Sequence, residues 1–247
     1  PSPAPRGRPT RRPGAVVHAR AFSSDDPEAL GWDRLRDVMA REGIVTLRGV
    51  GPEVVERATR ELSEFSPNLH HWDIFRADAE TLRAVCGPLA AAPLPGTLTR
   101  LSVDALTDDV VHAVQAFLDG HGVSPFSRDA LTGRLFPARL VVITHRDGRI
   151  AAAGFAGMTH NRFSPFHRDA WVGLIAVDPE LRGLGLGRQV DAITNLEAVD
   201  ALGAGGSIEF VAQDNAPSRA MLESCGLRQM PDRAVVMFST STDRLSR

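Results

Sequence analysis

The sequence predicts an α/β protein: a mixed sheet flanked by helices, preceded by a small α/β unit. Three observations lead to this fold class. Strand-like and helix-like segments alternate along most of the 247 residues. Asp147-Gly148 separates two apolar runs, which is a strong signal for a β-hairpin. A Pro-rich segment at 91–96 divides the chain, and the length allows one large domain or two small ones.

Residues 15–90, before this segment, have the pattern of the small α/β unit. Their apolar residues recur at helical spacing in two places, with a short β-branched run between them. Pro52 suits the first turn of a helix, whereas His70 and His71 are interpreted as loop residues. We expect a helix from Asp26-Pro27, a strand at 44–47, a helix from Pro52, and a helix around 79–85 that ends at Gly87-Pro88.

The N-terminal segment, residues 1–14, is rich in Pro and Arg. It contains no acidic residue and no apolar stretch. Such a composition is typical of a flexible tail and does not match a secretory signal.

Residues 97–247 are expected to form the larger domain. Thr107 is placed to cap a helix with acidic residues in its first turn. Gly203 is placed to end a long helix. We expect strands at 98–103, 140–144, 150–158, 171–177, 208–212 and 234–238, and helices from Thr107, at 186–202 and at 217–225.

The composition excludes several classes of function. All 28 basic residues are Arg, so the chain has neither a Schiff-base lysine nor a Walker lysine. The net charge of −2 gives no basic field for nucleic acid, and no apolar run reaches the about 18 residues of a membrane helix. Cys86 and Cys225 are too few for a zinc site or a disulfide framework. We therefore expect no metal and a reducing, cytoplasmic location.

A glycine-rich loop between a predicted strand and a predicted helix is the most informative segment. The strand runs into Val177–Pro179, and the loop, Arg182–Arg188, reads Arg-Gly-Leu-Gly-Leu-Gly-Arg. Backbone N–H groups at a helix N-terminus bind phosphate, and glycines let the anion approach closely. The spacing G-x-G-x-G differs from the G-x-G-x-x-G of dinucleotide-binding folds. The loop therefore predicts a site for a different phosphate-bearing ligand.

Two motifs in this part resemble the GCN5-related N-acetyltransferase (GNAT) family. The loop Arg182–Gly187, which follows Val177–Pro179, is similar to the family's pyrophosphate loop, Arg/Gln-x-x-Gly-x-Gly/Ala. Asn215, ahead of a short helix that ends at Gly226-Leu227, is similar to the family's second block. The resemblance covers roughly residues 97–247 and implies a GNAT-like mixed sheet flanked by helices.

The resemblance implies an acyl-CoA site in a V-shaped opening between the strand that ends at Val177 and the strand that begins near Ile208. The Val177 N–H would point at the thioester carbonyl, as an oxyanion-type donor. The loop amides would bind the pyrophosphate of acetyl-CoA or another acyl-CoA. The residues implied to bind this co-substrate are Ile175, Ala176, Val177, Arg182, Gly183, Leu184, Gly185, Leu186, Gly187, Arg188, Asn215 and Ser218.

The chain departs from the family at the general acid. Many members have a Tyr where this sequence has Leu222, and the chain contains no Tyr. A thiol with a pKa near ~8.5 is a good leaving group, so water could protonate it. Cys225 and Ser218 are the side chains that could substitute.

The general base is open as well. The resemblance implies a carboxylate near the start of the strand that leads to Val177. Asp169 is the nearest match, and we rank it together with its neighbour His167 above His160. The predicted catalytic residues are thus Asp169, His167 and Val177.

The leading functional prediction is an N-acyltransferase in which an amine attacks acyl-CoA directly in a ternary complex. A small-molecule amine is favoured over a protein terminus, and residues 15–90 are expected to shape the acceptor opening.

Two alternatives stay open: an acyl-CoA-binding sensor with little transfer, suggested by Leu222, and an acyl carrier protein as donor. A homodimer is also left open, and neither nucleic acid nor a membrane is an expected partner. The basic residues that could meet an acidic carrier are Arg6, Arg8, Arg11, Arg12 and Arg20.

Overall fold

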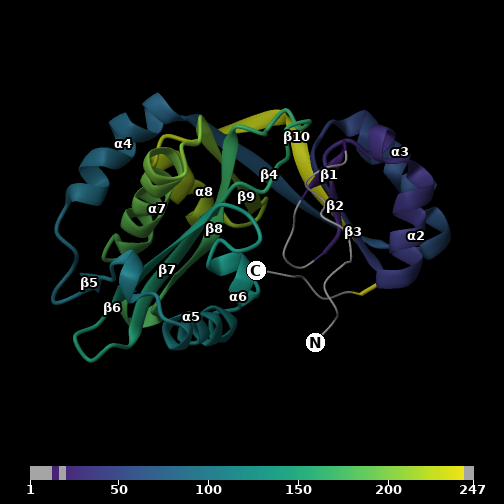
Figure 1. Cartoon of the computed structure of the whole chain (residues 1–247). Helices are drawn as coiled ribbons and strands as arrows, with labels where there is room; N and C mark the ends of the chain where they lie inside the picture. The colour runs from purple at the N-terminus through teal and green to yellow at the C-terminus, as the bar shows by residue number, and fades with distance from the viewer. Residues whose placement is uncertain (1–12, 17–20, 242–247) are drawn as a thin grey trace.

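A single sheet with helices on both faces runs through the molecule (Figure 1). The structure is a computed structural model that describes residues 13–16 and 21–241. Only the β2–β3 and β8–β9 pairs are parallel among the described strands, so the predicted mixed sheet is confirmed. From edge to edge, these ten strands are β1 (Ala15–Val16), β2 (Ser23–Ser24), β3 (Ile44–Val50), β10 (Arg228–Ser239), β4 (Asn68–Asp78), β9 (Gly206–Ala212), β8 (Asp169–Val177), β7 (Ile150–Gly157), β6 (Ala138–Thr144) and β5 (Thr99–Arg100).

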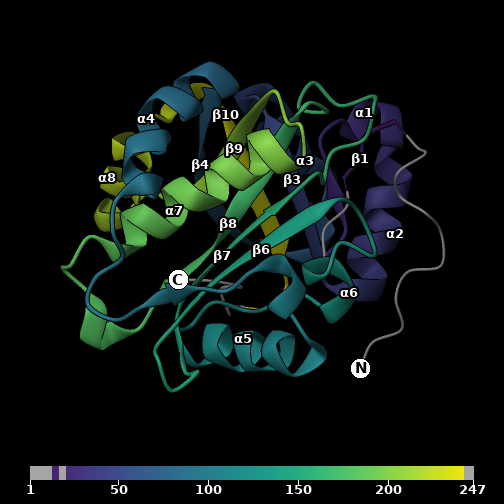
Figure 2. The ribbon, with the colours of Figure 1, turned by 60° about the vertical axis from the view of Figure 1, so that its left-hand side comes forward.

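The helices cover the two faces of the sheet unequally. Figure 2 shows α4 and α7 side by side over one face and α5 beneath the other. Helices α2, α3, α4, α7 and α8 pack on the first face, and α5 and α6 pack on the second. The α-helices of the described chain are α1 (Pro27–Leu30), α2 (Trp32–Glu42), α3 (Pro52–Glu61), α4 (Ala79–Ala91), α5 (Asp108–Gly120), α6 (Arg128–Leu131), α7 (Leu186–Leu196) and α8 (Ala216–Ser224).

Local signals placed several of these elements correctly. The Thr107 hydroxyl accepts a hydrogen bond from the Val110 N–H and caps α5. The hairpin β6–β7 turns at Asp147-Gly148, where Gly148 has a φ of +85°. The predicted long helix is α7 followed by a π-turn over Glu197–Ala201, and it ends at Gly203 with a φ of +70°.

Two local predictions were wrong at element ends. Helix α4 does not stop at Gly87-Pro88 but continues through Pro88 to Ala91. Leu82 and Cys86 of α4 are fully buried against the sheet, and this packing outweighs the hydrogen bond that Pro88 removes. The strand expected at 98–103 is only Thr99–Arg100, because the chain turns into a 3₁₀ segment at Val103–Ala105.

Strands from both predicted parts of the chain interleave. The last strand, β10, lies between β3 and β4, and β4 lies between β10 and β9. The β10–β4 pairing runs from Arg228↔Arg76 to Ser239↔Asn68. One sheet therefore crosses the boundary at 91–96. The division into units 15–90 and 97–247 stays a prediction, and the expected tail lies, up to residue 12, outside the described residues.

Strand β4 was missed, and the pair His70-His71 belongs to it rather than to a loop. Its polar residues hide the strand pattern because they have partners across the sheet. Asp73 forms an ion pair with Arg219 of α8, and Arg76 forms one with Asp169 of β8. A single sequence gives no sign of such partners.

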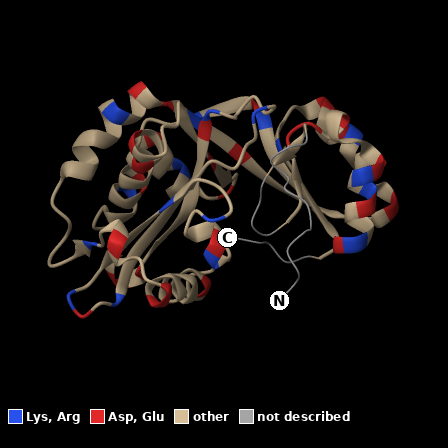
Figure 3. Ribbon diagram, in the orientation of Figure 1, with Lys and Arg blue, Asp and Glu red and all other residues tan. Residues whose placement is uncertain are grey.

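The charged residues form no large area of one sign on the N-terminal helices. Figure 3 shows acidic and basic positions interspersed along α2 and α3. Some of them pair, as in the 2.7 Å contact between Arg57 Nη1 and Glu28 Oε1. Among the described residues, no helix combines the length and the apolar character that crossing a membrane requires.

Candidate functional site

The sheet opens between β8 and β9. These parallel strands pair only from Asp169↔Gly206 to Trp171↔Ile208, and the rest of each strand lacks this partner. The V-shaped opening that the resemblance implied therefore begins just beyond Trp171.

A β-bulge in β8 marks the point of separation. On β7 the residues Ala153 and Phe155 are paired with Ala176 and Gly173, so β8 carries one extra residue here. Leu174 lies in this bulge with a φ of +54°, a left-handed conformation that is unusual for a non-glycine residue. Such strain costs about 1–3 kcal/mol and is concentrated at functional sites.

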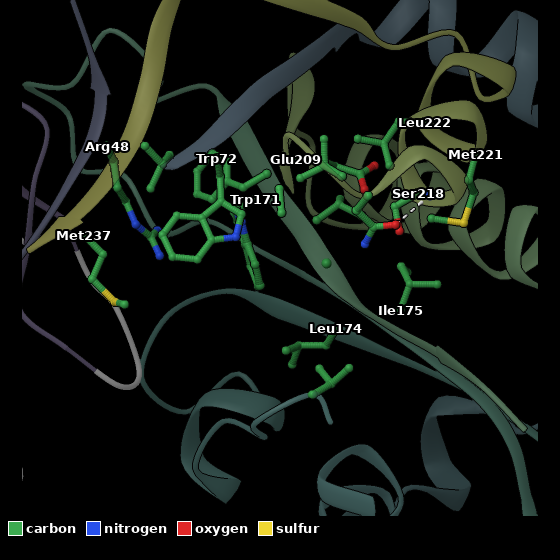
Figure 4. Close-up of a pocket in the computed structure, with 18 of the residues that line it drawn as sticks. Arg48, Trp72, Trp171, Leu174, Ile175, Glu209, Ser218, Met221, Leu222 and Met237 are labelled. Atoms are coloured by element: carbon green, nitrogen blue, oxygen red, sulfur yellow. Dashed lines mark hydrogen bonds between the residues drawn. The ribbon is translucent and has the colours of Figure 1, made fainter. Parts of the chain in front are cut away.

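A pocket of about 190 Å³ lies in the opening and passes through the sheet. Figure 4 shows Arg48 and Met237 at one end and Ser218 and Met221 at the other, with Glu209 between them. Strands β3, β4 and β10 contribute to the first end, and α8 contributes to the second. The pocket is thus built by both parts of the chain.

The backbone of β8 presents a hydrogen-bond donor to this opening. The Asp178 N–H donates to the carbonyl of Ala151 on β7 at 2.9 Å. Successive N–H groups of a strand point to opposite edges, so the Val177 N–H points away from β7. It faces the edge from which β9 has separated.

The glycine-rich loop leads from β8 into α7. Gly183 and Gly185 have φ values of +79° and +78°, and a Cβ added to either would meet no atom within 4 Å. Gly185 is the N-cap of α7 and offers no side-chain cap, so the first N–H groups of the helix are left for another acceptor. Arg182 and Arg188 are exposed beside them.

The other predicted loop residues contribute through the backbone. Leu186 is buried in the core, whereas Leu184 is 59% exposed. Gly187 lies against the pocket, since a Cβ there would be 3.6 Å from Met221 Sδ and 3.7 Å from Val177 Cγ2. The loop therefore neighbours the pocket through Met221, without lining it.

Asn215, Ser218 and Ile175, three of the residues predicted to bind the co-substrate, line the pocket, whereas Ala176 is buried in the core. The Asn215 Oδ1 accepts a hydrogen bond from the Ser218 N–H at 3.1 Å and so caps α8. Pro217 lies in the first turn of this helix, where its missing N–H is tolerated.

Leu222 also lines the pocket, at the place where the family carries its Tyr. Cys225 is fully buried, and its Sγ contacts the carbonyl of Arg188 at 3.6 Å. Contact with Cys86, together with burial, raises the pKa of the Cys225 thiol, so it is a poor proton carrier. Of the two predicted substitutes for Tyr, only Ser218 reaches the pocket.

None of the predicted base residues lines the pocket, and Asp169 lies at the closed end of the opening. Asp169 is buried, and both its oxygens accept from Arg76, at 2.8 and 3.2 Å. His167 is exposed, with Nδ1 2.9 Å from the Ser164 carbonyl. His160 is buried, which lowers its pKa to about 3 with help from the nearby charge of Arg48.

Glu209 on β9 was not predicted, although it lines the pocket. It belongs to a buried group with Asp191 and Asn195 of α7, in which Asn195 Nδ2 donates to Glu209 Oε1 at 2.9 Å. Burial raises the pKa of the Glu209 carboxyl well above its usual range, and the neighbouring Asp191 raises it further. Burial likewise raises the pKa of Asp191. No local pattern in the sequence marks this pair.

Arg48 on β3 was also not predicted. It is 2% exposed, and burial lowers its pKa to about 9. Its Nε and Nη1 have no hydrogen-bond partner among the described residues, and its guanidinium lies 5.2 Å from the Phe210 ring centroid. Nothing in the sequence shows that a β3 side chain reaches a site bounded by β8 and β9.

Within the described part of the chain, no three His, Cys, Asp or Glu side chains are grouped to hold a metal ion.

Comparison with known proteins gives the family of this fold. Residues 113–227 match the model of the acetyltransferase (GNAT) family. No curated protein matches the chain.

Solved structures share the fold at low sequence identity. A Drosophila protein is 16% identical with a TM-score of 0.61, covering 95% of this chain and 77% of its own. A tandem GNAT protein from the clavulanic acid biosynthesis pathway is 14% identical with a TM-score of 0.55, covering 92% and 77%. A GNAT-family protein from Novosphingobium aromaticivorans is 19% identical with a TM-score of 0.46, and the match covers 69% of this chain. The chain spans 64% of the length of that protein. The glycine-rich loop and the opening between β8 and β9 both lie within residues 113–227, the part of the chain that matches the GNAT acetyltransferase family.

Proposed function

We propose that the protein is an N-acyltransferase that moves an acetyl or other short acyl group from acyl-CoA to the amine of a small molecule. One observation carries this proposal. The Val177 N–H faces the opening, and Gly187 of the glycine-rich loop lies beside Val177 and the pocket residue Met221, so a donor bound at the loop would have its reactive end at the opening that holds the pocket. Amine and thioester would then react directly in a ternary complex, where fixed proximity lowers the barrier.

The donor end is built mainly from backbone groups. The N–H groups at the start of α7 would donate hydrogen bonds to the pyrophosphate, with Arg182 and Arg188 adding positive charge. Bound acyl-CoA supplies an activated thioester carbonyl. The Val177 N–H would donate to its oxygen, and such a fixed donor stabilises the negative charge that develops during attack.

Glu209 is the pocket group best placed to take a proton from the amine. It is the acidic residue among the pocket-lining side chains, and burial together with Asp191 raises its pKa, so that its carboxylate holds a proton more tightly than an exposed one does. The roles predicted for Asp169 and His167 stay predictions. Arg76 occupies both Asp169 oxygens, so this carboxylate would have to leave an ion pair before it could accept a proton.

Ser218 is the side chain best placed to donate a proton to the leaving thiolate. It lines the pocket at its α8 end, where its hydroxyl can pass a proton on from water. A thiol with a pKa near ~8.5 leaves readily, so a weak donor is sufficient.

The acceptor end takes residues from the first part of the chain, as expected of a unit that shapes the acceptor opening. Thr46, Arg48 and Trp72 line this end. A pocket of this size suits a small amine better than a folded protein surface. The cytoplasmic location and a homodimer stay predictions.

Two measurements on the whole chain test the proposal. Calorimetry with coenzyme A and acetyl-CoA should show binding, and release of free thiol from acetyl-CoA should depend on an added amine from a panel of amino acids and alkylamines. Failure to bind coenzyme A would overturn the proposal.

A second candidate is an acyl-CoA sensor with little transfer. Leu222 favours it, because an apolar side chain fills the place of the family's proton donor. Tight coenzyme A binding without turnover on any amine would select the sensor. The arginines proposed to meet an acyl carrier protein lie outside the described residues, so this donor is tested by salt-sensitive binding of such a carrier.

A further inference from the structure

Arg48 is a buried cation without a counter-charge among the described residues. Its guanidinium makes no ion pair there, and Nε and Nη1 have no acceptor. Burying an unpaired charge costs several kcal/mol, so such residues are rare unless a partner arrives from outside. The one favourable contact described for it is the Phe210 ring, which is a weak substitute for an anion.

The alternation of β3 directs Arg48 into the pocket. Val45 and Leu47 pack against α2 and α3 on one face of the sheet. Thr46 and Arg48 therefore point to the other face, where both line the pocket. This placement follows from the strand itself and is independent of the residues that bind the donor.

The pocket holds two ionisable side chains, one basic and one acidic. Among the described residues that line it, only Arg48 and Glu209 can carry a charge. Figure 4 shows them apart, with Trp171 between them. The rest of the wall is mostly apolar or aromatic, so electrostatic forces here are strong.

We propose that Arg48 binds the carboxylate of the acceptor, so that the acceptor is an amino acid or a closely related amino carboxylate whose amine faces Glu209. The inference rests on the proposed function and names its substrate class. A carboxylate satisfies the planar guanidinium through two hydrogen bonds and balances its single charge. A phosphate dianion would leave one negative charge unbalanced in the same buried place.

The carboxylate could instead belong to a dicarboxylic acyl group. The position of Arg48 favours the acceptor, because the donor end is at α8 and the glycine-rich loop, and Arg48 lies at the opposite end of the pocket (Figure 4). The experiment includes this alternative as a separate arm.

The test compares amino acids with their carboxamides. Acetyl-CoA is offered with leucine, phenylalanine and alanine and with the amide of each, and thiol release is measured for wild type, Arg48→Met and Arg48→Lys. We expect wild type to prefer at least one acid over its amide. Arg48→Met should raise KM for that acid about 10- to 100-fold, as for loss of a charged hydrogen-bonded pair, and leave the amide within about 3-fold. Arg48→Lys keeps the positive charge but loses the paired N–H donors of the guanidinium, so its KM for the acid should lie between those of wild type and Arg48→Met.

Arg83→Met is the matched control, because Arg83 is a half-exposed arginine of α4 that pairs with Asp200 outside the pocket. This variant should leave KM unchanged for both the acid and the amide. In the donor arm, succinyl-CoA replaces acetyl-CoA with leucinamide as acceptor. An Arg48→Met defect seen in this arm and absent with amino acids would overturn the assignment to the acceptor.

A binding measurement separates this inference from the proposed function. Calorimetric titration of the same amino acids into the protein loaded with coenzyme A requires no turnover. Binding that is lost in Arg48→Met supports the carboxylate site even if no acyl group is transferred. Equal binding of acid and amide, or equal affinity in wild type and Arg48→Met, would overturn it.

Discussion

The two ends of the pocket are built in different ways. At the proposed donor end, beside the pocket, the groups expected to act are N–H groups of Val177 and of the loop Arg182–Arg188, which are neighbours in the sequence. At the acceptor end, the groups are the side chains of Arg48, Trp72 and Met237 from three strands distant in the chain. A site made of backbone N–H groups can be recognised in the sequence by a local pattern, in this case spaced glycines. A site whose side chains are brought together by the order of the strands has no such pattern.

The largest effect is expected at the donor end. Gly185→Glu places a bulky anion, in a strained conformation, where the pyrophosphate would bind, so coenzyme A binding should fall below detection in calorimetry. Gly203→Glu is the matched control, because Gly203 has a similar φ of +70° and open space outside the pocket. If Gly185→Glu binds coenzyme A as well as the wild type does, the loop is not part of the coenzyme A site.

A second test concerns the proton acceptor between the two ends. Glu209→Gln should lower kcat by about 10²-fold, the usual size for loss of a general base, and leave coenzyme A affinity unchanged. Activity of the wild type should rise with pH as the Glu209 carboxyl ionises, because its pKa is raised, and this limb should vanish in the variant. The groups that interact with Glu209 are Asp191, Asn195 and Cys225.

Asp169→Asn is the companion variant. It breaks the ion pair with Arg76 at the closed end, so we expect reduced stability with kcat largely retained. If kcat falls in Asp169→Asn and stays unchanged in Glu209→Gln, the general base is Asp169, as the resemblance implied.

A third test concerns the effect of the buried Arg48 on the free energy of unfolding. In the ligand-free protein, Arg48→Met removes a buried unpaired cation and should raise the free energy of unfolding by about 1–4 kcal/mol at pH 7, measured with urea. Burial lowers the pKa of Arg48 to about 9, so the cost is complete below this value and shrinks as pH rises from 9 towards 12.5. A destabilised variant would mean that Arg48 has a structural partner.

The smallest effect is expected at the buried carboxyls. Their raised pKa values mean that protonation favours the folded state, so this contribution is complete below about pH 4 and is lost as pH rises through the raised values. Asp191→Asn removes one ionisation, so the free energy of unfolding should fall less as pH rises, measured with urea at several pH values. Asp200→Asn, at an exposed ion pair, should leave the pH dependence unchanged.

The sequence was informative where structure is local. The hairpin at Asp147-Gly148, the cap at Thr107 and the stop at Gly203 depend on residues within a few positions, and all three are present in the fold. The loop before α7 belongs to the same class. The mixed sheet could be predicted from the order of its elements, but the order of its strands could not.

What escaped prediction depends on distant partners. Strand β4 has polar residues that are satisfied only because Arg219 and Asp169 come from other parts of the chain. Arg48 and Glu209 occupy unremarkable positions in short strands, and their roles arise from the separation of β8 and β9. Such residues can be recognised only after the fold has brought them together.

The position of β10 has a consequence for synthesis on the ribosome. Strands β3 and β4 are made long before Arg228–Ser239, which must insert between them. Until that last strand emerges, the edges of β3 and β4 that will pair with it are unsatisfied, and unpaired edges are prone to aggregation. The wall around Arg48 is thus completed only once Arg228–Ser239 has been made, so the growing chain has to keep its early strands soluble until then.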